Sequence, residues 1–127
     1  MMALGFRDVL YYKVKNIEDK EYSVRGTWEL QVAEKLNELG IKWIRNHILK
    51  YRRPDESKER FYNPDFYLPN EDVFIEVKGY YSEKDKEKME YVLLYNPNAK
   101  IKMIFQKELK MLMNNSIELA QISFLSL

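Results

Sequence analysis

The sequence contains no cysteine among its 127 residues. It therefore lacks both a disulfide framework and a thiolate metal site, a composition that fits the reducing cytoplasm. No stretch approaches the roughly 20 consecutive apolar residues of a membrane-spanning helix. The Met1-Met2 start is not followed by the charged and apolar segments of a signal peptide. We therefore expect a cytoplasmic protein with no membrane partner.

An excess of charge of one sign is also missing. Lysine and arginine total 21 residues against 20 aspartates and glutamates, which leaves a net charge of +1. Many nucleic-acid-binding domains are basic overall, so this balance weakens a nucleic-acid interpretation without excluding it. Positive charge can still gather on one face while acidic residues are used at a metal site.

Internal repeats and low-complexity segments are absent as well. The length suits one domain over residues 1–127. Hydrophobic residues make up 46% of the chain and aromatic residues 14%, which is enough to build a core.

The clearest helical signal lies at residues 24–39. Apolar residues recur there at helical spacing, Ser23 or Thr27 can cap the start, and Gly40 stands where a left-handed residue ends a helix. Glu29 is expected at the edge of the buried face. The apolar positions are Trp28, Val32, Ala33, Leu36 and Leu39.

The remaining segments alternate between strand and helix patterns. Residues 1–22 could form strand or helix, with a loop predicted at residues 16–21. Residues 53–59 are polar turn material, and residues 116–127 are apolar enough to pack. Strands are expected at 41–45, 48–52, 60–67, 72–78 and 100–105, and helices at 82–95 and 107–113. This order predicts an α/β fold of the α+β kind, with a mixed central β-sheet flanked by helices.

Residues 60–79 are predicted to form two strands joined by a short turn, and they carry polar residues that are unusual for strands. Because side chains alternate along a strand, Ile75 should face the core, whereas Glu76 and Lys78 should face the other side. Antiparallel pairing of the two strands would bring Asp65 close to Glu76 at one end of the sheet.

Asp65 and Glu76 together suggest a metal site, because two carboxylates at close range repel each other unless a cation neutralises them. Oxygen ligands suit Mg²⁺ or Mn²⁺, which would polarise a phosphoryl oxygen and activate water. Lys78 should stay protonated beside two acids, and we expect it to orient water and offset transition-state charge. Glu29 would add a carboxylate if its helix packs beside the strands.

These residues resemble the PD-(D/E)xK nuclease superfamily, in the order Pro64-Asp65 and then Glu76-Val77-Lys78, with Glu29 on a preceding helix. Within that superfamily, the sequence is similar to the bacteriophage endonuclease I type of four-way-junction-resolving enzyme over about residues 23–106. It also resembles small phage endonucleases that carry Arg-Gly-Thr-Trp-Glu and Pro-Asp-Phe-Tyr-Leu-Pro stretches. The matching pieces are Glu29 with Val32, residues 40–43, 62–70 and 74–79, and the lysine-rich helix that follows.

The resemblance implies a restriction-endonuclease-like core and Mg²⁺-dependent hydrolysis of phosphodiester bonds in DNA, with Mn²⁺ as a substitute. It implies Lys78 as the catalytic lysine. Junction-resolving relatives are intertwined dimers joined by a bridge, so a homodimer is a candidate assembly, although residues 53–59 at the corresponding place are predicted to form an ordinary hairpin turn. The implied metal ligands are Asp65, Glu76, Glu29 and the backbone carbonyl of Val77.

Basic residues form two groups that could contact phosphates, and such contacts give affinity without reading sequence. The second group alternates with acids on the later helix, so a solvated, salt-bridged face is the competing interpretation there. Arg25, one turn before Glu29, would either hold that carboxylate or touch a phosphate. The first group is Lys50, Arg52, Arg53, Lys58 and Arg60, and the second is Lys84, Lys86 and Lys88.

Each candidate also has a structural interpretation. Glu76 and Lys78 alone could be a surface ion pair, which contributes little to stability, and a helix glutamate such as Glu29 is usually solvated. His47, the only histidine, is either a general base or ligand or a structural residue. The Tyr80-Tyr81 pair could stack on bases or pack against the core.

We therefore expect a metal-dependent DNA endonuclease that is structure-selective for branched DNA such as a four-way junction. The enzymatic alternative is a sequence-specific homing, restriction or mismatch-repair endonuclease. The alternative from another class is a non-catalytic DNA-binding subunit, against which the intact Asp65, Glu76 and Lys78 argue.

Overall fold

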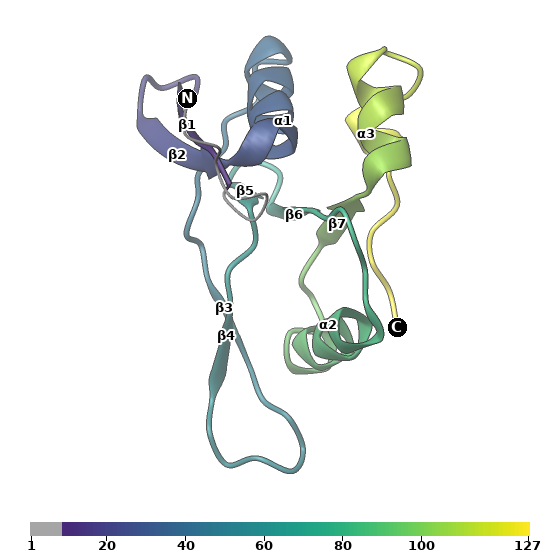
Figure 1. Ribbon diagram of the computed structural model, residues 1–127. Helices are drawn as coiled ribbons and strands as arrows, with labels where there is room; N and C mark the ends of the chain where they lie inside the picture. The colour runs from purple at the N-terminus through teal and green to yellow at the C-terminus, as the bar shows by residue number, and fades with distance from the viewer. Residues whose placement is uncertain (1–8) are drawn as a thin grey trace, which may run out of the picture.

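The computed structural model describes residues 9–127 and shows an α+β fold, as expected from the order of patterns (Figure 1). Strands and helices are mixed along the chain. The elements are β1 (Tyr11–Lys15), β2 (Glu21–Arg25), α1 (Gly26–Glu38), β3 (Leu49–Tyr51), β4 (Arg60–Tyr62), β5 (Phe66–Leu68), β6 (Val73–Val77), α2 (Glu83–Tyr95), β7 (Ile101–Ile104), α3 (Gln106–Met113) and the 3₁₀ turn Leu119–Gln121. Within residues 9–127, no helix combines the length and apolar character needed to span a bilayer.

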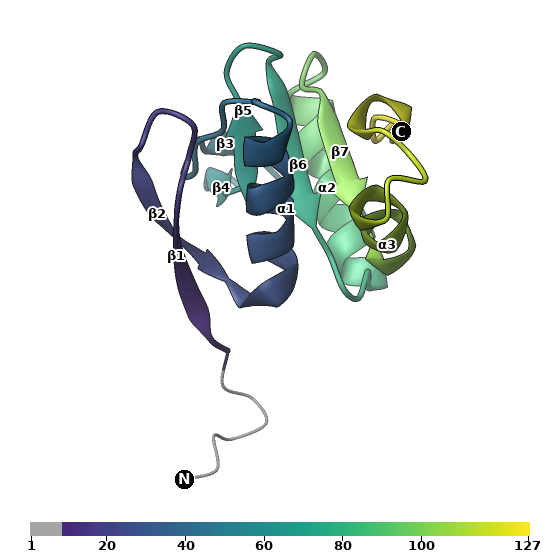
Figure 2. The same ribbon diagram turned by 90° about the horizontal axis from the view of Figure 1, so that it is seen from above.

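The centre of the fold is a three-stranded mixed sheet in the order β5-β6-β7. β6 pairs antiparallel with β5 and parallel with β7. Helices α1 and α3 cover one face, and α2, which connects the parallel strands, covers the other (Figure 2). Covering both faces is typical of sheets with parallel pairs, because the crossover helix has to pack back onto the sheet.

The predicted alternation along β6 is confirmed, but its second face is not left to solvent. Val73 and Ile75 pack with α1 and α3, as expected for the core-facing side. Phe74 lies on the other side, in a second core with residues of α2 and β7. Only the end of this second face is polar, and that end carries Glu76 and Lys78.

The predicted strand 60–67 is wrong in one respect, because it splits at Pro64. β4 pairs with β3, whereas β5 pairs with β6. A proline has no N–H to donate to a ladder, so the chain changes sheets there. The β3–β4 hairpin extends from the body of the molecule beside α2 (Figure 1). Residues 53–59 lie in the turn of this hairpin, as predicted.

The predicted strand 41–45 is also absent, and only an isolated bridge joins Ile44 to Tyr67. This segment instead places Trp43 in the core. The Trp43 side chain is 0% exposed, packs against Tyr22 and Phe66, and donates from Nε1 to Asn37 Oδ1 at 2.9 Å. One buried side chain thus joins the first hairpin, α1 and the central sheet.

Helix α1 begins two residues later than predicted, because Val24 and Arg25 belong to β2. Neither Ser23 nor Thr27 caps it. The helix instead starts after Arg25, whose backbone N–H donates to Glu29 Oε1 at 2.9 Å. The predictions for two other helix ends are confirmed. Gly40, after α1, has the expected left-handed φ of 70°, and Ser82 caps the start of α2 in a reciprocal pair with Asp85.

The two ends of the described chain pack onto this core. Residues 11–25 form a β-hairpin, while residues 1–8 of the ambiguous first segment lie outside the described residues. At the other end, Ile122 is buried and the Leu125 N–H donates to Ile101 O at 2.7 Å. The C-terminal segment therefore lies along the outer edge of β7, which confirms a packed tail.

Replacing Trp43 by alanine should lower the free energy of unfolding by about 3–5 kcal/mol, because it removes a buried aromatic side chain and leaves a cavity. Urea unfolding followed by circular dichroism measures this change. The control is Tyr80→Ala, since Tyr80 is 79% exposed and its loss should change stability by no more than about 0.5 kcal/mol. Equal midpoints for both variants would contradict the assigned core.

Candidate active site

Asp65 and Glu76 face each other where β5 begins and β6 ends. Phe66 pairs with Ile75 in the antiparallel register, so Asp65 and Glu76 are the next two residues outward. Asp65 Oδ2 accepts a hydrogen bond from the Val77 N–H at 2.7 Å. The side chain of Asp65 thus adds one hydrogen bond to the end of the β5–β6 ladder, next to Pro64, which has no N–H to donate.

The Val77 carbonyl lies on the same side of β6 as Asp65. In a strand, the N–H and C=O of one residue point to the same neighbouring strand. Since the Val77 N–H reaches Asp65, the Val77 carbonyl is also directed to that edge. Two carboxylates and one carbonyl are therefore gathered at one end of the sheet, which are three of the four ligands that the sequence resemblance implies; the fourth is Glu29.

The setting of both carboxyls disfavours their charged forms. Burial is the largest cause that raises the pKa of Asp65 well above its usual range, followed by the charges of Glu76 and Glu29. Burial also raises the pKa of Glu76, against the opposing effects of Tyr62 and Lys78. A bound cation would offset the cost of ionising these buried carboxyls and would reduce the repulsion between them, because a nearby positive charge favours the ionised forms.

Tyr62 fixes the position of Glu76. Its side chain is 3% exposed, and its hydroxyl donates to Glu76 Oε1 at 2.9 Å. Burial, with Glu76 as the next cause, raises the pKa of Tyr62, so its hydroxyl stays protonated and remains a donor. Tyr62 is not among the site residues predicted from the sequence, because a spacing of three residues would put it on the face opposite to Asp65 in a continuous strand.

Lys78 follows directly after β6 on the same face as Glu76. Its backbone N–H donates to Ile104 O at 2.9 Å, which ties it to the end of β7. Its Nζ lies 3.6 Å from Asp85 Oδ1, and both side chains are about one third exposed, at 32% and 31%. Asp85 also caps α2, so one carboxylate links the lysine to the helix N-terminus.

Glu29 is connected to Asp65 through an arginine. Glu29 Oε1 accepts from Arg45 NH1 at 2.9 Å and from the Arg25 N–H at 2.9 Å. The same Arg45 nitrogen donates to the backbone carbonyl of Asp65 at 3.1 Å. Glu29 is therefore on the helix edge facing the strands, as expected, but its carboxylate is engaged in an ion pair in which Glu29 is 12% and Arg45 18% exposed.

Arg45 is the main element of the site that the sequence analysis did not single out. It lies in the irregular segment between α1 and β3, within the stretch that had been predicted to be a strand. No local pattern marks such a residue, because its partners Glu29 and Asp65 are 16 and 20 positions away.

The oxygens present fit a divalent metal that keeps several waters. Among residues 9–127, no three histidine, cysteine, aspartate or glutamate side chains converge closely enough to enclose a metal ion. Asp65, Glu76 and the Val77 carbonyl instead offer a small, open set of hard oxygens. Mg²⁺ is commonly held by one or two carboxylates plus water and substrate phosphates, so this set suits it.

The sequence model of the family described as phage endonuclease I matches residues 9–120. The chain belongs to the phage endonuclease I family. The match spans the segment that contains Glu29, Asp65, Glu76 and Lys78. Membership indicates a nuclease that cleaves DNA. No curated protein and no solved structure matches the chain.

In this phage endonuclease I family member, most of the predicted phosphate-binding residues of the β3–β4 hairpin are engaged with acids. Arg53 pairs with Glu87 at 2.6 Å, Arg60 with Glu56 at 2.7 Å, and Lys50 with Glu59 at 3.7 Å. Arg52, Lys58 and Arg25 are exposed, and of Arg25 only the backbone N–H bonds to Glu29.

The three lysines of α2 do not share one environment. Lys84 is exposed, and Lys86 is exposed and pairs with Glu83 at 3.3 Å, as the salt-bridged interpretation expected. Lys88 is half-buried and lines a cavity of about 30 Å³ together with Tyr62, Glu76 and Lys78. Only Lys88 among the three therefore approaches the candidate active site.

The aromatic candidates are divided in the same way. His47 stacks on Tyr67, with ring centroids 4.0 Å apart and planes at 9°. This contact fits the structural interpretation of His47. Tyr81 packs against Phe105, with ring centroids 5.4 Å apart, and lines the cavity beside Glu76, whereas Tyr80 is exposed.

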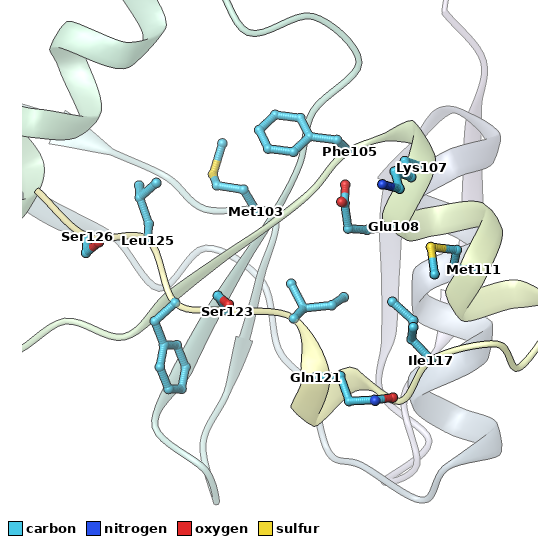
Figure 3. A pocket seen from close by; sticks show the side chains of 12 residues that line it. Met103, Phe105, Lys107, Glu108, Met111, Ile117, Gln121, Ser123, Leu125 and Ser126 are labelled. Atoms are coloured by element: carbon cyan, nitrogen blue, oxygen red, sulfur yellow. The ribbon is translucent and has the colours of Figure 1, made fainter.

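A larger cavity has none of the residues Glu29, Asp65, Glu76 or Lys78 in its lining. It has about 560 Å³ and is enclosed by β7, α3 and the C-terminal segment (Figure 3). Met103, Phe105, Met111 and Ile117 give it a largely apolar wall. Size alone therefore does not locate the chemistry in this protein.

Replacing Arg45 by methionine should lower the free energy of unfolding by about 3 kcal/mol, because it leaves the Glu29 carboxylate buried without its partner. Adding Glu29→Gln should recover part of this loss, since the uncompensated charge is then gone. Arg60→Met is the control, because its pair with Glu56 is more exposed and should contribute no more than about 1 kcal/mol. Chemical denaturation of the wild type, Arg45→Met, Glu29→Gln, the double variant and Arg60→Met measures these differences, and an additive double variant would argue against the coupling.

Proposed function

We propose that this protein is a Mg²⁺-dependent endodeoxyribonuclease with a PD-(D/E)xK type of active site. The observation that carries the proposal is the facing pair Asp65 and Glu76, held at the end of β5 and β6 with raised pKa values. Lys78 stands beside this pair on the same face of β6. Family membership provides the coarser statement of a DNA-cleaving nuclease, and the geometry supplies the proposed roles.

Asp65, Glu76 and the Val77 carbonyl would hold the cation, with Mn²⁺ as a substitute for Mg²⁺. When bound, the ion would polarise a phosphoryl oxygen and make water a nucleophile near neutral pH. Tyr62 would keep Glu76 in place through its hydrogen bond to Oε1. Lys78 would orient water and offset the negative charge that develops on the phosphoryl group.

Glu29 takes a positioning role in this proposal. Through Arg45 it holds the backbone of Asp65, because Arg45 donates to both residues. The expected role of Glu29 as a direct metal ligand would fall to its Oε2, because Oε1 already accepts from Arg45 and from the Arg25 N–H. The effect of Glu29 on the pKa of Asp65 supports its proximity to the metal-binding pair.

Branched DNA such as a four-way junction is the proposed substrate, and the sequence resemblance supports it. Paired cleavage of a junction needs two active sites, so the proposal includes a homodimer. Sequence-specific cleavage of duplex DNA is the enzymatic alternative, and a non-catalytic DNA-binding subunit is the remaining one.

A cleavage assay distinguishes these functions. Purified protein with Mg²⁺ is offered single-stranded DNA, linear duplex, supercoiled plasmid and a four-way junction. We expect cleavage of the junction in Mg²⁺ or Mn²⁺ and binding without cleavage in Ca²⁺. Glu76→Gln and Lys78→Ala should each lower the rate by about 100-fold or more, because they remove charges that act on the transition state.

The contrary outcomes of this assay are equally specific. Absence of cleavage of every substrate would favour the binding subunit. Cleavage of duplex at one fixed sequence would exclude junction selectivity, and equal activity in Ca²⁺ would exclude the metal chemistry. Analytical ultracentrifugation at micromolar concentration tests for the dimer.

The metal site can also be tested without activity. Adding Mg²⁺ should raise the melting temperature of the wild type, because a ligand that binds only the folded state stabilises it. Without metal, the folded-state pKa of Asp65 is raised, so its contribution to stability should grow as the pH falls toward the unfolded value near about 4. Asp65→Asn should reduce both the Mg²⁺ effect and this pH dependence in thermal melts. A wild-type melting temperature that is insensitive to Mg²⁺ up to millimolar concentrations would contradict the site.

A further inference from the structure

Helix α2 brings a second lysine to the candidate active site. The ammonium group of Lys88 lies over the ring of Tyr62, with Nζ 5.2 Å from the centre of the ring. Lys88 lines the same small cavity as Glu76 and Lys78, and its charge acts on the Glu76 carboxyl. Since Tyr62 donates to Glu76 at 2.9 Å, one buried ring positions both the carboxylate and the lysine.

The two lysines differ in how their charge is balanced. Lys78 lies 3.6 Å from Asp85. Within residues 9–127, no carboxylate lies within the 4.0 Å of an ion pair with Lys88. Ammonium groups bind phosphate oxygens as point charges, so a lysine without an acidic partner beside the reacting centre suits an anionic ligand.

The size of the cavity places that ligand at its entrance. A volume of about 30 Å³ holds a water molecule but is too small for a phosphodiester. Lys78 and Asp85 are about one third exposed, at 32% and 31%, so the cavity borders the surface at this end. A DNA phosphate lying at this entrance would be within reach of Lys88 and close to the Glu76 side chain, since both line the cavity.

We propose that Lys88 is a phosphate-binding residue of the active site, which contacts the cleaved phosphate of DNA or one of its immediate neighbours. This assignment rests on the proposed nuclease function and separates Lys88 from Lys84 and Lys86. Those two lysines lie on the exposed part of the same helix, and Lys86 is already paired with Glu83.

The test compares Lys88→Gln with Lys84→Gln, which removes the same charge one helical turn away. Single-turnover cleavage of a four-way junction with saturating protein should slow by about 10-fold or more for Lys88→Gln, the effect of losing a charged hydrogen bond. Lys84→Gln should stay within about twofold of the wild type, as expected for an exposed charge at the rim.

Neutral methylphosphonate linkages locate the contact. They are placed singly at the cleaved phosphate and at its neighbours, and junction binding is measured in Ca²⁺ and in EDTA. At the phosphate that Lys88 contacts, the wild type and Lys84→Gln should each lose about 10-fold in affinity, whereas Lys88→Gln should lose almost nothing further. A structural role of Lys88 would not produce this dependence on one phosphate.

Lys88→Arg keeps both the charge and the stacking on Tyr62, so it should retain the wild-type pattern even if Lys88→Gln is less stable. Equal rates and equal methylphosphonate losses for the wild type and Lys88→Gln would overturn the assignment. If Glu76→Gln is inactive in the same experiments, that result contradicts only the role of Lys88. Cleavage by Glu76→Gln would instead contradict the proposed nuclease site itself.

Discussion

The burial of the facing Asp65 and Glu76 carboxyls is the constraint on which the candidate site depends. The β5–β6 register places these two carboxyls opposite each other, in a setting buried enough to raise both pKa values. Such an arrangement disfavours the metal-free folded state at neutral pH. Hydrogen bonds from Tyr62 and from the Val77 N–H hold the two side chains in place, and these are the oxygens proposed to bind a divalent cation.

Each of the two acids is held by an element outside the β5–β6 pair. Arg45 and Glu29 tie the Asp65 backbone to α1, while Tyr62 ties Glu76 to the β3–β4 hairpin. Because β4 leads through Pro64 directly into Asp65, the hairpin adjoins both carboxyls.

Both faces of β6 are used, and this gives the site its asymmetry. The odd-numbered residues pack on α1 and α3 and provide the rigid side of the sheet. The even-numbered residues begin in the second core at Phe74 and end at Glu76 and Lys78, where α2 contributes Asp85 and Lys88. The acids proposed to bind metal and the lysines Lys78 and Lys88 therefore meet where the sheet, α2 and the hairpin adjoin.

The sequence by itself determined the elements whose signals are local. The spacing of apolar residues identified α1, the alternation along β6 assigned its two faces, and the pattern around Asp65, Glu76 and Lys78 identified the candidate site. The tertiary structure decided the break at Pro64, the irregular course around Trp43 and the positions of Arg45, Tyr62 and Lys88. These depend on partners 12 to 27 positions apart, such as Val77 with Asp65 and Asn16 with Trp43. Contacts of that kind arise only when the sheet register and the helix packing are in place, so no window of neighbouring residues contains them.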